Sequence, residues 1–222
     1  MALLQYKRSF DKGLGVLSMH PAVRYLCLAL DLALNLEEII YFLLPFCGRI
    51  GTVKVSSLLV KNRSDIVKII LGLGFRVWVD LKFHDTPQVV ADEIKAVKDT
   101  GAHFATIHLS GGVEMVKAAV LAADNLSHWS SGLKVLGVTM LTTIDKKIMN
   151  EELRIPGEVI DQVLHLTRLG RNNGIAGVVC SGLEARAVRD ICGPKFFIAT
   201  PGVRLANSKR GDHKRVVTPK EA

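Results

Sequence analysis

The stretch VWVDLKFHDTPQVV, residues 77–90, begins as a hydrophobic strand and ends where a helix begins. Its apolar start is typical of a strand that is covered on both faces, as in a parallel sheet. Ionisable side chains follow within six positions, namely Asp80, Lys82, His84 and Asp85. Beyond them Val90, Ile94 and Val97 repeat at helical spacing until Gly101. The stretch therefore predicts a strand and a helix with a charged cluster between them.

The composition is that of a globular protein. The 222 residues are 49% hydrophobic and 23% charged, which suits one large domain or two small ones. The longest apolar run, residues 39–47, is about half as long as the ~20 residues that a membrane span needs. No basic and apolar leader precedes it, so we expect neither a membrane protein nor a secreted one.

The net charge of +8 raises the question of a nucleic-acid partner. Lysines and arginines are spread along the chain and are not interleaved with aromatic residues, so solvated helix faces explain the charge better. The cysteines show neither CxxC pairing nor the spacing of metal ligands. We expect them to be buried, reduced thiols of a cytoplasmic protein, at Cys27, Cys47, Cys180 and Cys192.

Short apolar runs recur along the chain about 20 to 40 residues apart, which is the spacing of βαβ units. The predicted strands are residues 25–31, 51–55, 75–80, 104–110, 134–141, 174–181 and 195–202. No GxGxxG motif follows the first strand, which argues against a dinucleotide-binding sheet. The pattern favours an α/β fold of the TIM (β/α)8 barrel type. We expect one domain over residues 1–222, with residues 1–21 as an N-terminal arm or helix.

In such a barrel the chemistry lies at the carboxyl ends of the strands. Asp80 and Lys82 are two positions apart, so an extended strand would point both side chains to one face. Lys54 belongs to the preceding strand, about 5 Å away, and Asp85 could extend the row from the following loop. The alternative is an ion-pair network that only closes the barrel, but desolvation makes buried pairs poor stabilisers. We therefore expect an active site here.

The segment DLKFHDTP, residues 80–87, closely resembles the signature of the orotidine 5'-phosphate decarboxylase family in its bacterial form. Further segments resemble that family in the same order: LALD (28–31), VKV (53–55), IHLSGG (107–112), GVTMLTT (137–143), GVVCSGLEA (177–185), TPGVR (200–204) and GDHKRVVTP (211–219). The resemblance implies a TIM barrel that decarboxylates orotidine 5'-phosphate to uridine 5'-phosphate in de novo pyrimidine synthesis. It also implies that neither a cofactor nor a metal ion takes part.

The resemblance implies roles for single residues. Lys54, Asp80, Lys82 and Asp85 match the family's catalytic Lys-Asp-Lys-Asp tetrad. Lys82 would be the proton donor, and Asp85 would enter the site of the partner subunit in a homodimer. His84, inside the motif, is expected to orient a neighbour rather than to transfer a proton.

Substrate contacts are implied as well. Asp31 matches the carboxylate that holds the ribose hydroxyls, and Thr142 matches a contact to the pyrimidine. Arg204 and His213 fall at positions that approach the phosphate, although the family usually has Gln where this chain has His213. A second departure is Ser56, where the family usually has Gly. A third is Gln88, since the family usually has DIPN where this chain has DTPQ.

Thr218 and Pro219 are predicted to be the N-cap and first residue of the seventh helix. We therefore expect the eighth strand and helix, with part of the phosphate site, to be missing from this chain. Other interpretations stay open at this point. One is a truncated or inactive homologue that keeps the fold without efficient turnover. Another is a metal-dependent sugar-phosphate decarboxylase or aldolase of the same superfamily, which shares the D-x-K-x-x-D core.

Overall fold

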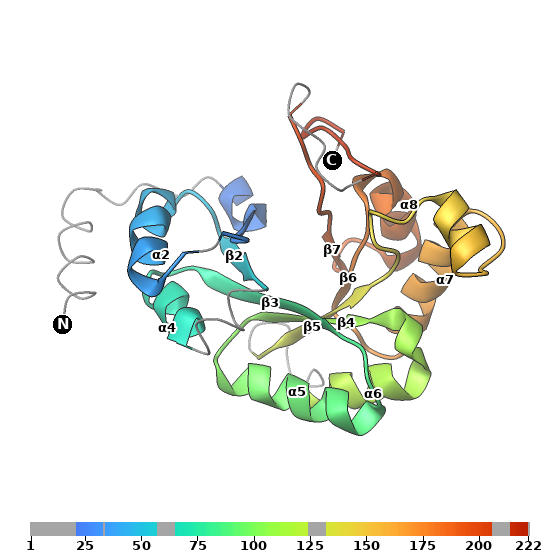
Figure 1. The fold of residues 1–222 in the computed structure, drawn as a ribbon, viewed down its shortest axis with the longest axis horizontal. Helices are drawn as coiled ribbons and strands as arrows, with labels where there is room; N and C mark the ends of the chain where they lie inside the picture. Colours follow the sequence, from blue (N-terminus) through green and yellow to red (C-terminus); the bar gives the residue numbers. More distant parts are fainter. Residues whose placement is uncertain (1–20, 33, 57–64, 124–131, 206–213, 222) are drawn as a thin grey trace. The chain divides into compact units, whose positions relative to one another are not determined.

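The computed structural model describes residues 21–32, 34–56, 65–123, 132–205 and 214–221 (Figure 1). Its contacts divide the chain into two compact units. The first comprises residues 1–81 with 96–105, and the second comprises residues 82–95 with 106–222. The predicted arm, residues 1–21, lies outside the described residues except for its last residue. The single domain over residues 1–222 stays a prediction.

The strands form a seven-stranded sheet in which the order in space is the order in the sequence. Their bounds are β1 Cys27–Ala29, β2 Thr52–Val55, β3 Arg76–Phe83, β4 Phe104–His108, β5 Lys134–Val138, β6 Gly177–Val179 and β7 Phe197–Ala199. Pairing is parallel from β1 to β3 and from β5 to β7. Sequential parallel strands connected by helices are the pattern of a TIM barrel. The predicted fold class is thereby confirmed, and β7 is the last strand among the described residues.

Helices follow most of the strands, as a (β/α) repeat requires. The α-helices are α2 Leu36–Leu43, α4 Asp65–Gly72, α5 Pro87–Asp99, α6 Gly112–Ala122, α7 Val159–Asn172 and α8 Gly182–Cys192. The short helices are η1 Pro21–Tyr25, η2 Leu44–Phe46, η3 Leu109–Gly111 and a π-helical turn η4 Ile148–Glu152. Helix α5 covers the predicted stretch and ends just before Gly101, whose φ of 82° suits glycine. No helix of the described residues is long and apolar enough to cross a membrane.

The first unit is built from β1, β2 and most of β3, with α2 and α4 beside them (Figure 1). Val53 and Val77 are fully buried on the strands, while Ile39 and Ile70 are buried on the two helices. Helix α2 begins at a capping box, in which Asn35 and Glu38 bond to each other's backbone N–H groups. The parallel pairing of β1 and β2, with Ala29 opposite Lys54, places the ends of the two strands next to each other.

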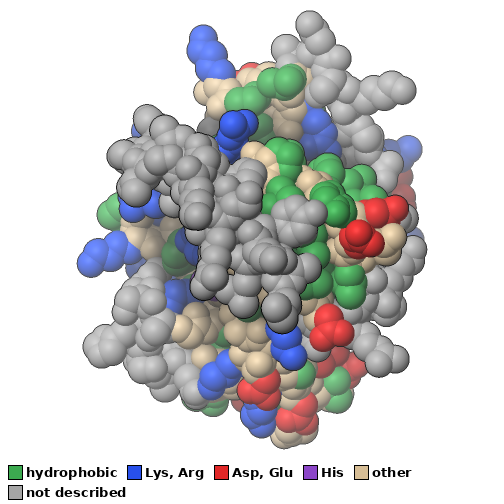
Figure 2. All heavy atoms as spheres, turned by 90° about the vertical axis from the view of Figure 1, so that its left-hand side faces the viewer, with side chains coloured by type: hydrophobic (Ala, Val, Ile, Leu, Met, Phe, Trp, Pro, Cys, Tyr) green, Lys and Arg blue, Asp and Glu red, His purple; other side chains and the backbone are tan. Residues whose placement is uncertain are grey.

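Strand β1 is short and partly exposed. Cys27 on β1 is exposed, so the prediction of four buried cysteines is wrong there, and only Cys180 is fully buried. Tyr25 and Leu26, just before the strand, and Tyr41 on α2 are also exposed. Figure 2, in which the left-hand side of Figure 1 faces the viewer, shows hydrophobic side chains at the surface.

The second unit places α6, α7 and α8 beside β5, β6 and β7 (Figure 1). Val135 and Val178 are fully buried on the strands, and Val163 and Val188 are fully buried on α7 and α8. Helix α8 begins at a capping box between Ser181 and Glu184. The helix therefore starts immediately after β6, at the carboxyl end of that strand.

The last described residues form a turn. Glu221 accepts hydrogen bonds from the backbone N–H of Thr218, at 2.7 Å, and from its hydroxyl, at 2.8 Å. These contacts resemble one half of a capping box, as the prediction of a helix start at Thr218 and Pro219 implies. The described residues show a turn at Pro219–Glu221 rather than a regular helix.

Candidate functional site

In the first unit, Lys54 on β2 is held between two carboxylates. Its Nζ lies 3.1 Å from Oδ2 of Asp80 on β3 and 3.5 Å from Oδ2 of Asp31, which follows β1. The side chains of Lys54 and Asp80 are only 15% and 8% exposed, whereas that of Asp31 is 52% exposed. The structure thus brings together three of the residues predicted from the sequence. They form an alternating row of charges that is open to solvent at Asp31.

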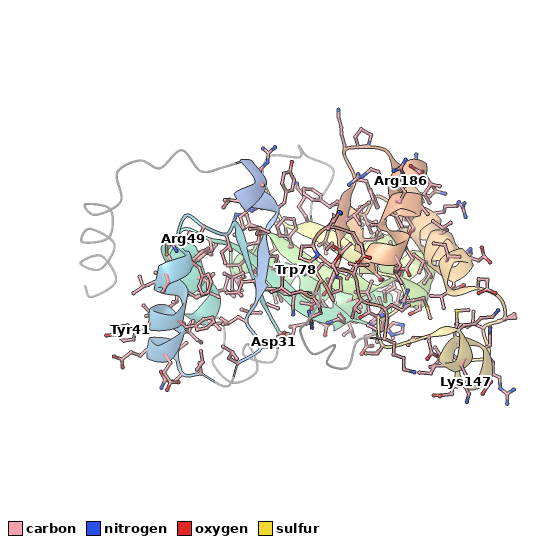
Figure 3. The ribbon with its side chains drawn as sticks, turned by 90° about the horizontal axis from the view of Figure 1, so that it is seen from above. Asp31, Tyr41, Arg49, Trp78, Lys147 and Arg186 are labelled. Atoms are coloured by element: carbon pink, nitrogen blue, oxygen red, sulfur yellow. The ribbon has the colours of Figure 1, made fainter. Side chains whose placement is uncertain are left out.

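Asp31 has a second partner in the same unit. The hydroxyl of Ser56, just after β2, donates to Oδ1 of Asp31 at 2.7 Å. Lys54 uses the other carboxylate oxygen, so both oxygens of Asp31 are engaged. Figure 3 labels Asp31 beyond the end of β1. Ser56 was identified in the sequence only as a departure from the family, and its bond to Asp31 could not be read from the pattern.

Lys82 lies in β3, which continues to Phe83 and so is longer than the predicted strand ending at Asp80. Its φ of 53° is in the left-handed region, which a non-glycine residue rarely adopts. The backbone N–H of Lys82 donates to the Thr106 hydroxyl of β4 at 3.0 Å. Strain of this kind is frequent at functional sites. The simple alternation of side chains used to predict one face for Asp80 and Lys82 does not apply at this residue.

Asp85 and His84 lie in the loop between β3 and α5, and both are exposed. Oδ1 of Asp85 accepts from the backbone N–H of Thr86 at 2.6 Å. The ring of His84 packs against that of His108 on β4, with 5.3 Å between the ring centroids. His84 thus contacts another side chain of the second unit, and its orienting role stays a prediction.

Thr142 lies after β5 in the second unit and is buried, at 6% exposure. Its carbonyl oxygen accepts from the backbone N–H groups of Lys214 and Arg215, at 3.0 and 3.2 Å. Nζ of Lys214 also lies 2.6 Å from Oδ2 of Asp145 in the same loop. The loop after β5 is therefore fastened to the residues that follow position 213.

Arg204 follows β7 and is joined to the same segment. Its backbone N–H donates to the carbonyl of Val217 at 2.8 Å, and Val203 and Val217 form a parallel β-bridge. Thr142 and Arg204 are thus tied to one short segment, residues 214–217. His213 lies outside the described residues, so its predicted phosphate contact stays a prediction.

Sequence reasoning missed Arg215 and Glu184, which form a buried ion pair in the second unit. Their side chains are only 10% and 6% exposed. Burial raises the pKa of the Glu184 carboxyl, and the Arg215 guanidinium opposes that rise. Both residues lie inside the motifs GDHKRVVTP and GLEA, which was the available signal.

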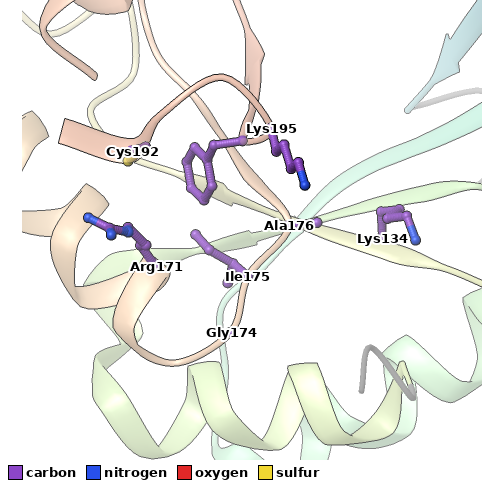
Figure 4. A pocket seen from close by; sticks show the side chains of 8 residues that line it. Lys134, Arg171, Gly174, Ile175, Ala176, Cys192 and Lys195 are labelled. Carbon is purple, nitrogen blue, oxygen red and sulfur yellow. The ribbon is translucent and has the colours of Figure 1, made fainter. Parts of the chain in front are cut away.

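A cavity of about 340 Å³ lies at the opposite, amino-terminal ends of β5, β6 and β7 (Figure 4). Ile175, Ala176 and Phe196 line its apolar part, while Lys134, Arg171 and Lys195 line its rim. Arg171 donates to the carbonyl of Ile191 at 2.6 Å, which is a typical contact at the end of a helix. The cavity therefore does not belong to the candidate site. Within the described residues, no group of three His, Cys, Asp or Glu side chains could hold a metal ion.

Comparison with known proteins adds to this geometry. The profile of the "Orotidine 5'-phosphate decarboxylase / HUMPS family" matches residues 24–222. The chain is 41% identical over 179 residues to an orotidine 5'-phosphate decarboxylase from Paramagnetospirillum magneticum, covering 79% of this chain and 75% of that protein. It is 36% identical over 190 residues to one from Geobacillus kaustophilus, covering 84% of this chain and 77% of that protein.

Solved structures agree with these relatives. The crystal structure of an orotidine 5'-phosphate decarboxylase from Lactobacillus acidophilus superposes with a TM-score of 0.71 at 33% identity, covering 81% of each chain. An uncharacterised conserved protein from Geobacillus kaustophilus superposes with a TM-score of 0.72 at 33% identity, covering 79% of this chain and 82% of that one.

Proposed function

We propose that this chain, which belongs to the orotidine 5'-phosphate decarboxylase / HUMPS family, converts orotidine 5'-phosphate to uridine 5'-phosphate and carbon dioxide. The family resemblance seen in the motifs is thereby confirmed. Curated relatives at 36 to 41% identity are named orotidine 5'-phosphate decarboxylases, which favours this activity over a sugar-phosphate decarboxylase or aldolase. The observation that carries the proposal is the charge row of Asp31, Lys54 and Asp80 in a member of this family.

The reaction requires stabilisation of negative charge on carbon. When the bond between C6 and the carboxylate breaks, its electron pair remains on C6, and no neighbouring carbonyl can delocalise it. In our proposal the ammonium of Lys82 stabilises that charge and then gives its proton to C6. A cation that is already in place does not have to be reorganised when the charge develops.

Asp80 and Lys54 have complementary roles in the proposal. Asp80 would lie near the substrate carboxylate and favour its departure, because like charges repel in a buried site. Lys54, 3.1 Å from Asp80, holds that carboxylate in place. Asp85 would complete the tetrad from the partner subunit of a homodimer. Its exposure in the loop after β3 is compatible with a contact to another chain.

The substrate contacts follow the same logic. We assign the ribose hydroxyls to Asp31, the pyrimidine to Thr142, and the phosphate to Arg204 and His213. Carboxylates accept hydrogen bonds from sugar hydroxyls, and a guanidinium binds phosphate through several donors at once. A histidine in place of the usual Gln can also donate to the phosphate. We further propose a cytoplasmic location, where the pyrimidine pathway operates, and no nucleic-acid partner.

The decisive experiment follows the ultraviolet absorbance of orotidine 5'-phosphate with the purified chain. We expect the substrate to disappear and uridine 5'-phosphate to form, at the same rate with and without a metal chelator. Strict dependence on a divalent metal would point to the sugar-phosphate enzymes instead. Binding of uridine 5'-phosphate without any turnover would identify an inactive homologue.

A further inference from the structure

Arg215 makes an unusual set of contacts for a residue outside the charge row. Its Nη1 pairs with Oε1 of Glu184 in the first turn of α8. Its Nη2 donates to the carbonyl oxygens of Met140, at 3.0 Å, and Leu141, at 3.1 Å, just after β5. One guanidinium thus joins the carboxyl end of β5 to the start of the helix that follows β6.

The backbone around Arg215 reinforces this junction. The N–H groups of Lys214 and Arg215 both donate to the carbonyl of Thr142. The hydroxyl of Ser181, which caps α8, donates to the carbonyl of Arg215 at 3.3 Å. Side chain and backbone of Arg215 therefore bind the same two loops, one after β5 and one after β6.

Two residues further on, Val217 extends the junction to β7. Its carbonyl accepts from the N–H of Arg204, and it forms the β-bridge with Val203. A Cβ added to Gly182 would lie 2.4 Å from Cγ2 of Val217, so only glycine allows this close approach at the start of α8. Residues 214–217 therefore hold the carboxyl ends of three adjacent strands together.

Stability alone does not account for burying Arg215 and Glu184. Removing each charge from water costs several kcal/mol, so a buried pair stabilises little compared with apolar side chains of the same size. What such a pair provides is a defined geometry, because a guanidinium satisfies its donors only in one arrangement of acceptors. Here the acceptors are Glu184 and the two carbonyls that immediately precede Thr142.

We propose that Arg215 and Glu184 are positioning residues for nucleotide binding. The pair fixes Arg215 between the loop that carries Thr142 and the start of α8, and Val217, two residues further on, binds the loop that carries Arg204. Through this segment the pair keeps the two loops at the spacing that receives a pyrimidine nucleotide and its 5'-phosphate. The inference rests on the proposed function, since it concerns the same substrate. Loss of the pair lets the two loops separate, which weakens binding of a nucleotide more than binding of the nucleoside.

The test compares uridine 5'-phosphate with uridine by isothermal titration calorimetry on the full chain. The variants are Arg215→Lys, which keeps the charge but loses the fork of donors, and Glu184→Gln, which keeps the shape. We expect each substitution to lower the affinity for uridine 5'-phosphate roughly tenfold or more, as is usual when a buried charge pair is broken. The affinity for uridine should fall much less. The ratio of the affinity for uridine 5'-phosphate to that for uridine should therefore fall.

Arg189→Lys is the matched control. Arg189 on α8 also donates to two carbonyl oxygens, those of Gly193 and Phe196, at 2.6 and 2.7 Å, but it does so at the opposite end of β7. Arg189→Lys should lower the melting temperature about as much as Arg215→Lys does, but it should leave the ratio of the two affinities unchanged. Circular dichroism and melting temperature establish that each variant is folded.

The outcomes separate this inference from the proposed function. A parent chain that binds uridine 5'-phosphate but does not decarboxylate orotidine 5'-phosphate contradicts the function, while the affinity ratio still tests the pair. An unchanged ratio in Arg215→Lys and Glu184→Gln, or the same fall in Arg189→Lys, overturns the positioning role. So does a folded parent chain that binds uridine no more weakly than uridine 5'-phosphate.

Discussion

Nζ of Lys54 lies 3.1 Å from Oδ2 of Asp80, and the register of their strands explains this contact. Lys54 on β2 is paired in register with Trp78 on β3. Asp80 is two positions beyond Trp78, so its side chain shares the face of Trp78 and Lys54. The long lysine side chain spans the remaining step along the strand. A strand pairing thus places a cation beside a carboxylate that is almost fully buried.

Replacing Lys54 by Met should destabilise the protein, because it removes the cation that lies 3.1 Å from the buried Asp80. We expect a loss of about 3 kcal/mol in the free energy of unfolding, together with loss of decarboxylation. Urea denaturation provides the measurement. The control is Lys146→Met, which removes an exposed pair with Glu158 and should cost less than about 1 kcal/mol. Equal effects of the two substitutions would argue against a buried charge row.

Replacing Lys82 by Ala should abolish turnover. If Lys82 both stabilises the carbanion and donates the proton, the barrier rises by about 5 kcal/mol or more, beyond a thousandfold in kcat/KM. Steady-state kinetics with orotidine 5'-phosphate checks this. Lys95→Ala is the control, because Lys95 on α5 forms an exposed contact with Asp92. Near-normal activity of Lys82→Ala would remove Lys82 from the mechanism.

Ser56→Gly, which introduces the residue usual in the family, should raise the KM for orotidine 5'-phosphate. The substitution removes the 2.7 Å hydrogen bond to Asp31, the carboxylate that we propose binds the ribose. A hydrogen bond to a charged group contributes about 1.5 kcal/mol or more, so KM should rise roughly tenfold with little change in kcat. Ser56→Thr keeps a hydroxyl and should retain most of the parental KM. An unchanged KM in Ser56→Gly would show that Asp31 does not depend on this bond.

Mixing inactive Asp85→Ala and Lys82→Ala chains should restore part of the activity if Asp85 acts in the partner's site. In a mixed dimer one site would then receive both an intact Lys82 and an intact Asp85. Activity is measured after subunit exchange, which size-exclusion chromatography of differently tagged chains establishes. The absence of recovery after proven exchange would contradict a shared site.

His103 should make the protein less stable in mild acid. Burial, and then the nearby Arg76 guanidinium, lower the pKa of His103 below its ordinary value of 6.5. Its Nδ1 faces the backbone N–H of Val77 at 3.4 Å, which requires a neutral acceptor. Below about pH 6.5 the unfolded chain takes up a proton that the folded chain does not, so stability falls as the pH falls. Above that pH the contribution of His103 is constant.

Melting temperatures between pH 7.5 and 5.5 measure this effect. His103→Gln should flatten the decline, because glutamine can still accept the hydrogen bond and does not titrate. His165→Gln, at an exposed position of α7, is the control and should leave the decline as in the parent chain. A parental decline in His103→Gln would assign the acid sensitivity to other groups.

The sequence by itself determined the succession of strands and helices and the identity of the family. Apolar runs and helical spacing depend on local chemistry, so β3 and α5 were predicted close to where they lie. Period-two spacing together with parallel neighbours also sufficed to predict that Lys54 meets Asp80. The backbone of Lys82 escaped this reasoning, because a φ of 53° breaks the alternation that a regular strand would have.

Tertiary structure alone decided which distant residues support the predicted ones. Ser56 is 25 residues from Asp31, and Arg215 is 31 residues from Glu184 and more than 70 from Met140. No local pattern encodes such pairs, since their contacts arise only when parallel strands align their carboxyl ends. Burial then selects the partners, because a charge removed from water must meet an opposite charge or several hydrogen-bonding groups. For Arg215 these are Glu184 and the carbonyls after β5.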